Sequence, residues 1–301
     1  MNAINFKHSI IFFNLCILLS PLNNIINLEL TIVCLFLILI IGISHGSLDN
    51  VKGRKLLNIF NIKSEYIFYV GYLTTSFLII IFWLIFPNVI LLFFLIVASY
   101  HFGKEDTVFS SNKKLFINEI LFFFKGSSII IAPLFFQREA TYEIFRTLNF
   151  YVFEATLFDD VFLLILISAS FLSNFFISKR KDFNLKTLLF IDFLSVIILN
   201  YFLNPILAFT LYFCFLHSIR HSITLAFELD KSVKKGFKKF ISKAVPLTLV
   251  TGFSFLITIY FLSNFYELNE AIYKVIFIGL ASLTFPHILL EYLLEKNEKR
   301  S

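Results

Sequence analysis

The sequence is poor in charged residues, which make up 15% of its 301 positions. A soluble domain of this length would have about a quarter of its residues charged. The composition is instead 58% hydrophobic and 19% aromatic. Apolar runs of about 15 to 22 residues alternate with short charged stretches, which is typical of membrane proteins with several helical spans. We therefore expect an all-α, polytopic transmembrane helical bundle, with residues 1–301 forming a single integral-membrane domain.

Cysteine is also scarce, and this excludes two common kinds of site. Only Cys16, Cys34 and Cys214 are present, each inside an apolar run, so we interpret them as small buried side chains rather than as disulfides or zinc ligands. The net charge of +6 does not indicate nucleic acid as a partner, because the basic residues lie between the apolar runs, as topology signals do.

The apolar runs predict about ten membrane spans, with membrane lipid as their surroundings. The first run has no small-residue cleavage site after it, so we expect a helix there rather than a removed signal peptide. Pro87 and Pro205 mark two tight connections. The predicted spans are residues 6–22, 28–48, 66–86, 88–102, 115–136, 160–178, 187–202, 205–226, 244–263 and 272–294.

The distribution of basic residues predicts how the spans are oriented in the membrane. All but five of the 26 lysines and arginines fall on one side of a ten-span bundle. The exceptions are Arg138, Arg146 and Lys274 on the other side, and Lys125 and Arg220 within spans. Cytoplasmic loops carry the excess of Lys and Arg, so both termini are expected in the cytoplasm and the protein in the cell (inner) membrane.

Histidine is rare too, with six residues in the chain, yet five of them fall at one predicted membrane depth. His217 and His221 are four apart, so on a helix they lie about 6 Å apart along the axis on nearly the same face. His45, His101 and His287 lie near the corresponding ends of other spans. Ionisable residues in membrane spans are rare and tend to face the bundle interior, so the pattern indicates a shared metal or cofactor site.

The residue types restrict which metal centre this is. Imidazole ligands without thiolate suit iron, copper, zinc or nickel. A di-iron desaturase or hydroxylase site needs about eight histidine ligands in several paired motifs. This chain has six histidines, so such a site is excluded. A haem bound by two histidines stays open. Asp49 and Asp106 are candidates to orient ligand imidazoles, although both also fit interfacial or cap-like positions.

Two further charged residues are predicted within spans. Arg220 is expected to extend its guanidinium to the lipid headgroups. Lys125 has no evident role, and pairing with Asp192 on a neighbouring helix is the simplest hypothesis for it. A transporter would need acidic residues near the middle of the bilayer, and Asp192 is the candidate for such a position.

At its histidine motifs the sequence resembles the bacterial membrane-integral β-carotene 15,15′-dioxygenases of the Brp/Blh type. The similar stretches are residues 44–49 (SHGSLD), 100–106 (YHFGKED), 217–221 (HSIRH) and the pair Pro286-His287, and they occur in the family's order. The resemblance implies Fe(2+) held by His45, His101, His217 and His221, with His287 near the site. It also implies cleavage of the central double bond of β-carotene by O₂ into two molecules of retinal, which would serve a retinal-binding rhodopsin.

Other functions stay open at this point. The chain could be a different membrane oxygenase or hydroxylase acting on another polyprenoid, or a non-enzymatic haem-binding or metal-transporting bundle. For a carotenoid-cleaving oxygenase, a phenylalanine-rich tunnel between helices is the natural path for a substrate dissolved in the bilayer. The candidates to line it are Phe102, Tyr212, Phe213, Phe215 and Phe285.

Overall fold

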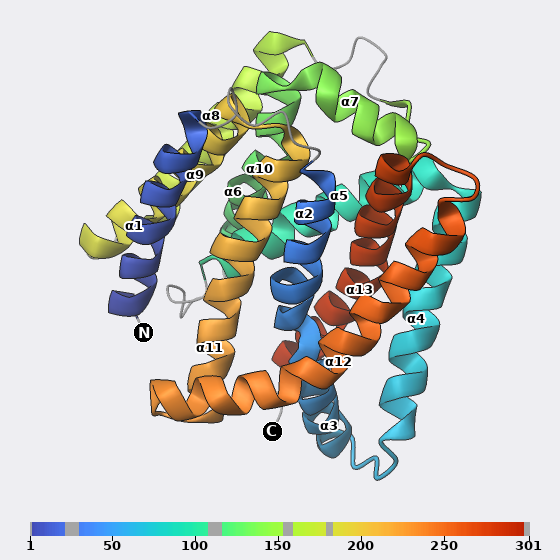
Figure 1. The fold of residues 1–301 in the computed structure, drawn as a ribbon. Coiled ribbons are helices and arrows are strands. Elements are labelled where there is room, and N and C mark those ends of the chain that lie inside the picture. The colour runs from blue at the N-terminus through green and yellow to red at the C-terminus, as the bar shows by residue number, and fades with distance from the viewer. Residues whose placement is uncertain (1, 22–29, 108–115, 153–158, 179–182, 298–301) are drawn as a thin grey trace.

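The chain folds into a bundle of helices (Figure 1). A computed structural model describes residues 2–21, 30–107, 116–152, 159–178 and 183–297, and the side chains of Asn2 and His45 lie outside the described part. The α-helices are α1 (Asn2–Leu19), α2 (Thr31–Leu37), α3 (Asp49–Ile59), α4 (Tyr66–Ile85), α5 (Pro87–Glu105), α6 (Phe116–Phe136), α7 (Arg138–Thr147), α8 (Asp160–Ser178), α9 (Phe183–Phe202), α10 (Pro205–Leu211), α11 (Ile219–Leu229), α12 (Val233–Leu262) and α13 (Leu268–Asn297).

Three short segments of other helical types interrupt the α-helices. A π-helix (Ile38–Gly42) and a 3₁₀-helix (Ile43–Leu48) join α2 to α3. A second π-helix (Tyr212–Ser218) joins α10 to α11. The two π-helices contact each other, and Gly42 allows this approach because a Cβ there would lie 2.5 Å from the ring of Phe213. π-Helical turns inside α-helices are frequent at functional sites; the first of these two precedes the 3₁₀-helix that carries His45, and the second contains His217.

The prediction of an all-α membrane bundle is confirmed. Among the described residues, nine helices are long and apolar enough to cross a membrane. They coincide in order with the second to tenth predicted spans. The first predicted span corresponds to the shorter apolar helix Ala3–Leu19, so whether that helix crosses the bilayer stays a prediction.

Several helices extend beyond the apolar runs that predicted them. Helix α12 begins at Val233 rather than near residue 244, so its lysine-rich first turns are helical instead of a loop. Lysine has high helix propensity, and a hydropathy pattern alone does not register that. Pro246 lies inside α12, and the helix in Figure 1 first runs across the lower end of the bundle and then rises along it.

Local sequence signals set several helix ends. Pro87 and Pro205 occupy the first turns of α5 and α10, where a missing N–H costs nothing. The side chain of Asn204 caps α10 by accepting from the backbone N–H of Ile206 at 3.1 Å. Asn61 and Asn149 follow α3 and α7 with φ of 57° and 59°, the left-handed conformation that commonly ends helices.

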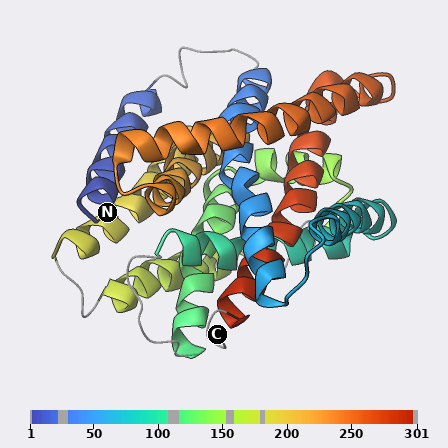
Figure 2. The same ribbon diagram turned by 90° about the horizontal axis from the view of Figure 1, so that it is seen from below.

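The centre of the bundle lies around α2 and the segment that follows it. Both views place α2 between α10–α11 and α13 (Figures 1 and 2), and α2 contacts both. Helix α7 lies across the upper end of the bundle in Figure 1. The start of α1 and the end of α13 lie toward the opposite, lower end. The side of the membrane that this end faces stays a prediction.

Helices α5 and α6 approach unusually closely, and this approach fixes the position of one histidine. A Cβ on Gly103 would lie 1.8 Å from the carbonyl oxygen of Phe122, and one on Gly126 would lie 1.9 Å from that of Ser99. Small residues at such crossings let helix backbones meet in membranes. The crossing anchors the end of α5 that carries His101 and directly precedes Asp106.

Candidate metal centre

Four of the five predicted histidines come together in the interior of the bundle. His101 lies on α5, His217 in the second π-helix, His221 on α11 and His287 on α13. All four are buried, with exposed fractions of 1% to 8%. The ring centre of His101 lies 5.4 Å from those of both His217 and His287, and the rings of His221 and His287 lie 6.1 Å apart.

These spacings match imidazoles that share one metal ion. A metal bound about 2.1 Å from each ring nitrogen would place neighbouring ring centres about 5 Å apart. The described rings lie on α5, on the continuous helix formed by the second π-helix and α11, and on α13, and the ring pairs given above fall close to that spacing. Each of these ring pairs is therefore close enough to share an ion. The ligand atoms that all lie within 4.8 Å of one another belong to two smaller groups, His101 with His287 and Glu291, and His221 with Glu105 and Glu291.

His45 lies on the 3₁₀-helix Ile43–Leu48, which follows the first π-helix. Its side chain lies outside the described part of the chain. The 3₁₀-helix itself contacts α11 and the second π-helix, which carry His221 and His217. The backbone therefore brings this turn to the cluster, and the role of His45 stays a prediction.

Each of three clustered imidazoles has a carboxylate at its Nδ1. Asp106 Oδ1 lies 3.1 Å from His217 Nδ1, and Glu105 Oε2 lies 3.1 Å from His221 Nδ1. The two carboxylate oxygens of Asp49 lie 2.8 and 3.0 Å from His287 Nδ1. A carboxylate at Nδ1 fixes the tautomer that protonates this nitrogen, so that Nε2 becomes the metal-binding atom.

Two tyrosines hold these carboxylates in turn. Tyr212 donates its hydroxyl to Asp106 Oδ2 at 2.6 Å, and Tyr72 donates to Asp49 Oδ2 at 2.9 Å. Burial acts to raise the pKa of Asp106, but the hydrogen bond from His217, together with the positive charges of Lys125 and Arg220, holds that pKa below its usual range. An ionised Asp106 is the form that accepts both bonds.

Sequence reasoning missed two acidic residues at the cluster. Glu291 lies with His101 and His287 in one group whose ligand atoms are all within 4.8 Å of one another, and with Glu105 and His221 in a second. Lys52 donates to Glu291 Oε1 at 2.5 Å. Glu291 follows His287 by four residues, the same spacing as His217 and His221, so the sequence did contain a signal for it.

The prediction for Arg220 was wrong. Its side chain is 2% exposed and donates to the two carboxylate oxygens of Asp192 at 2.7 and 3.1 Å. It also donates to the hydroxyl of Ser9 at 2.7 Å. Helix α11 is in the bundle interior, so a buried carboxylate takes the place of the lipid headgroups as the partner of this guanidinium.

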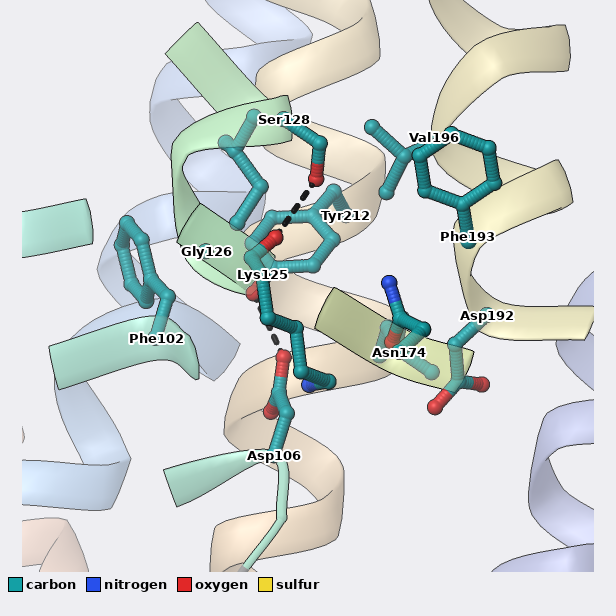
Figure 3. Close-up of a pocket in the computed structure, with 12 residues that line it drawn as sticks. Phe102, Asp106, Lys125, Gly126, Ser128, Asn174, Asp192, Phe193, Val196 and Tyr212 are labelled. Atoms are coloured by element: carbon teal, nitrogen blue, oxygen red, sulfur yellow. Dashed lines mark hydrogen bonds between the residues drawn. The ribbon is translucent and has the colours of Figure 1, made fainter. Parts of the chain in front are cut away.

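Asp192 therefore pairs with Arg220, and not with Lys125 as the sequence suggested. Figure 3 shows the charged ends of Lys125, Asp106 and Asp192 extending into one small pocket. This pocket has a volume of about 20 Å³, which is enough for about one water molecule. Asp106 lines this pocket and also contacts His217, whereas none of the clustered imidazoles lines it.

The remaining predicted features are structural. His8 Nε2 lies 2.7 Å from the backbone oxygen of Phe215. Cys16, Cys34 and Cys214 are buried free thiols, as predicted. Phe102 and Phe213 pack against His217, with ring centres 4.8 and 5.9 Å from it, so apolar side chains cover one side of the cluster.

Comparison with known proteins assigns the chain to a family. The family described as β-carotene 15,15′-dioxygenase matches residues 36–295. A β-carotene 15,15′-dioxygenase from an uncultured marine bacterium, 66A03, is 27% identical over 274 residues, which cover 88% of this chain and 94% of the relative. No solved structure matches the chain. The chain belongs to the β-carotene 15,15′-dioxygenase family.

Proposed function

We propose that the imidazole cluster holds a ferrous ion with which this chain cleaves β-carotene at its central 15,15′ double bond, using O₂ and giving two molecules of retinal. Membership of the family supports the reaction. The observation that carries the metal centre is the set of four buried imidazoles with ring centres 5.4 to 6.1 Å apart along the cluster.

The donor set suits iron. Imidazole and carboxylate groups bind iron, copper and zinc, and zinc has no redox chemistry with which to activate O₂. We propose His45, His101, His217 and His221 as ligands, and we add His287 as a candidate because its ring is as close to that of His101 as the ring of His217 is. Glu291 is the candidate carboxylate.

The bound ion would supply the O₂ chemistry that splits the double bond into two aldehydes. The side chains of this protein do the positioning. Asp106, Glu105 and Asp49 keep the Nδ1 protons of three imidazoles in place, so that each Nε2 stays ready to bind. Phe102 and Phe213 exclude water from one side, and no acid–base residue is needed because both oxygen atoms can come from O₂.

The substrate also suggests where the protein works and which partners it has. β-Carotene dissolves in the bilayer, so the membrane lipid delivers it to a multi-pass protein, which we place in the cell (inner) membrane. Retinal leaves as a reactive aldehyde, and a retinal-binding rhodopsin would be its acceptor. The other functions that the sequence allowed are an oxygenase acting on a different polyprenoid and a haem-binding or metal-transporting bundle.

Expression in a bacterium that accumulates β-carotene tests the proposal. We expect loss of the orange colour and appearance of retinal, and iron without a Soret absorption band in the purified protein. His101→Ala should abolish bleaching while the protein still inserts into the membrane. A Soret band, or full bleaching by His101→Ala, would contradict the proposed centre.

A further inference from the structure

A cavity of about 260 Å³ lies between α5 and α13 and reaches the candidate metal centre. Its inner wall includes His101, Glu105 and Glu291. Its other wall residues include Phe93, Leu289 and Tyr292, which are 50%, 47% and 55% exposed on the lipid-facing side of the bundle. One end of the cavity is thus at the imidazole cluster, and the other is among side chains that meet lipid.

The walls of the cavity divide into an apolar part and a polar part. Phe93 and Val97 on α5 face the same space as Phe285, Ile288 and Leu289 on α13. From Phe93 to the polar end at Lys104 the cavity follows α5 for about 16 Å. This length accommodates a rod-shaped apolar molecule better than a compact one.

The charged groups at the polar end have partners in the protein. Lys104 donates to Glu295 at 2.8 Å, Lys52 donates to Glu291 at 2.5 Å, and Glu105 lies 3.1 Å from His221. An apolar ligand can therefore lie against the apolar walls without leaving these charges unpaired, which would be costly.

Two aromatic rings stand at the lipid-facing end. Phe93 and Phe285 stack with ring centres 5.2 Å apart and an interplanar angle of 18°. Pro286 follows Phe285 inside α13 and lacks the N–H that would bond to the preceding turn. The missing hydrogen bond is the one to the carbonyl of Ser282, so the helix is free to bend in the turn before Pro286, which carries Phe285.

We infer that this cavity is the channel by which β-carotene passes from the bilayer to the metal centre, and that Phe93 and Phe285 form its gate. The inference rests on the proposed function, since the centre at the inner end gives the channel its destination. The apolar walls, the lipid-facing mouth and the paired charges fit a carotenoid. Of the five side chains that the sequence offered as a tunnel lining, Phe285 is the one that lines this cavity.

Cysteine protection in lipid nanodiscs tests the channel. Leu289→Cys places a thiol on the exposed part of the cavity wall, one helical turn from Phe285, and the native cysteines are buried. Under anaerobic conditions, where substrate binds without being consumed, saturating β-carotene should slow reaction of this thiol with N-ethylmaleimide at least fivefold. The matched control is Leu249→Cys on the lipid-facing side of α12, where Leu249 is 66% exposed, and its rate should not change.

Equal rates at Leu289→Cys with and without β-carotene, or equal slowing of both thiols, would overturn the channel. Iron analysis of the same samples keeps the two proposals separate. If β-carotene protects the Leu289→Cys thiol in a protein that binds no iron, the result would support the channel and refute the ferrous centre. An iron-loaded, active protein without protection would refute the channel alone. As a second measurement, Phe285→Trp should raise the KM for β-carotene at unchanged iron content, and an unchanged KM would count against the gate.

Discussion

Replacement of Asp106 by asparagine tests the geometry of the metal centre most sharply. The carboxylate accepts from His217 at 3.1 Å and from Tyr212 at 2.6 Å, and it is buried. An asparagine has one oxygen and one NH₂ group in place of two acceptors. If its oxygen stays with Tyr212, its NH₂ group faces His217 Nδ1 and favours the tautomer that protonates Nε2, which cannot bind a metal.

The expected magnitude follows from the lost hydrogen bond. A hydrogen bond to a charged group contributes about 1.5–3 kcal/mol, and about 1.4 kcal/mol corresponds to a tenfold change in affinity. Asp106→Asn should therefore weaken iron binding roughly 10- to 100-fold, the range typical for groups that orient metal ligands. Tyr212→Phe should have a smaller effect, because the carboxylate still accepts from His217.

The assay is iron content per protein after equilibration with a graded series of chelator concentrations, followed by bleaching of β-carotene. Asp230→Asn is the matched control, because Asp230, between α11 and α12, pairs with Lys239 of α12 at 2.7 Å and contacts none of the histidines whose side chains the structure describes. We expect the control to retain wild-type iron affinity. Wild-type iron binding by a folded Asp106→Asn protein would refute the role given to this carboxylate.

Three further predictions concern other parts of the bundle. Gly126→Ala should strongly reduce the yield of folded protein, because its Cβ would lie 1.9 Å from a backbone oxygen. Gly71→Ala is the control and should not reduce the yield, because a Cβ there has nothing within 4 Å. Equal yields of monodisperse protein from the two variants would contradict this prediction. Arg220→Met should lower the free energy of unfolding by about 3–5 kcal/mol, because it leaves Asp192 buried without its partner. Adding Asp192→Leu should restore most of this stability. Thermal unfolding in detergent measures both variants, and a double variant no more stable than the single one would argue against the ion pair. His287→Ala should lower the iron affinity at least tenfold, and unchanged affinity in chelator titrations would remove it from the ligand set.

Helix positions could be predicted from the sequence because lipid imposes a simple requirement. A span needs about 20 apolar residues to bury its backbone, so the apolar runs gave nine of the long helices in the described residues. The ends were less predictable. The lysines after Val233 have high helix propensity, so α12 begins before the apolar run. A hydropathy pattern does not record helix propensity and therefore misses this extension.

The histidine cluster could be predicted only in part. A common depth along the membrane follows from the sequence, but which rings face one another depends on how the helices tilt and rotate. The π-helix at Tyr212–Ser218 changes the direction of His217 relative to an ideal helix, and no residue type in that stretch signals it. The pairing of Arg220 with Asp192 likewise joins α11 to α9, and the separation of 28 positions carries no local pattern.

The most direct test of the metal centre is X-ray absorption at the iron edge on the purified protein in lipid. One iron per chain, with the outer-shell scattering of several imidazole rings and a lower imidazole count in His101→Ala, is the predicted result. Iron bound by sulfur or by a porphyrin, or a fully active protein without iron, would contradict it.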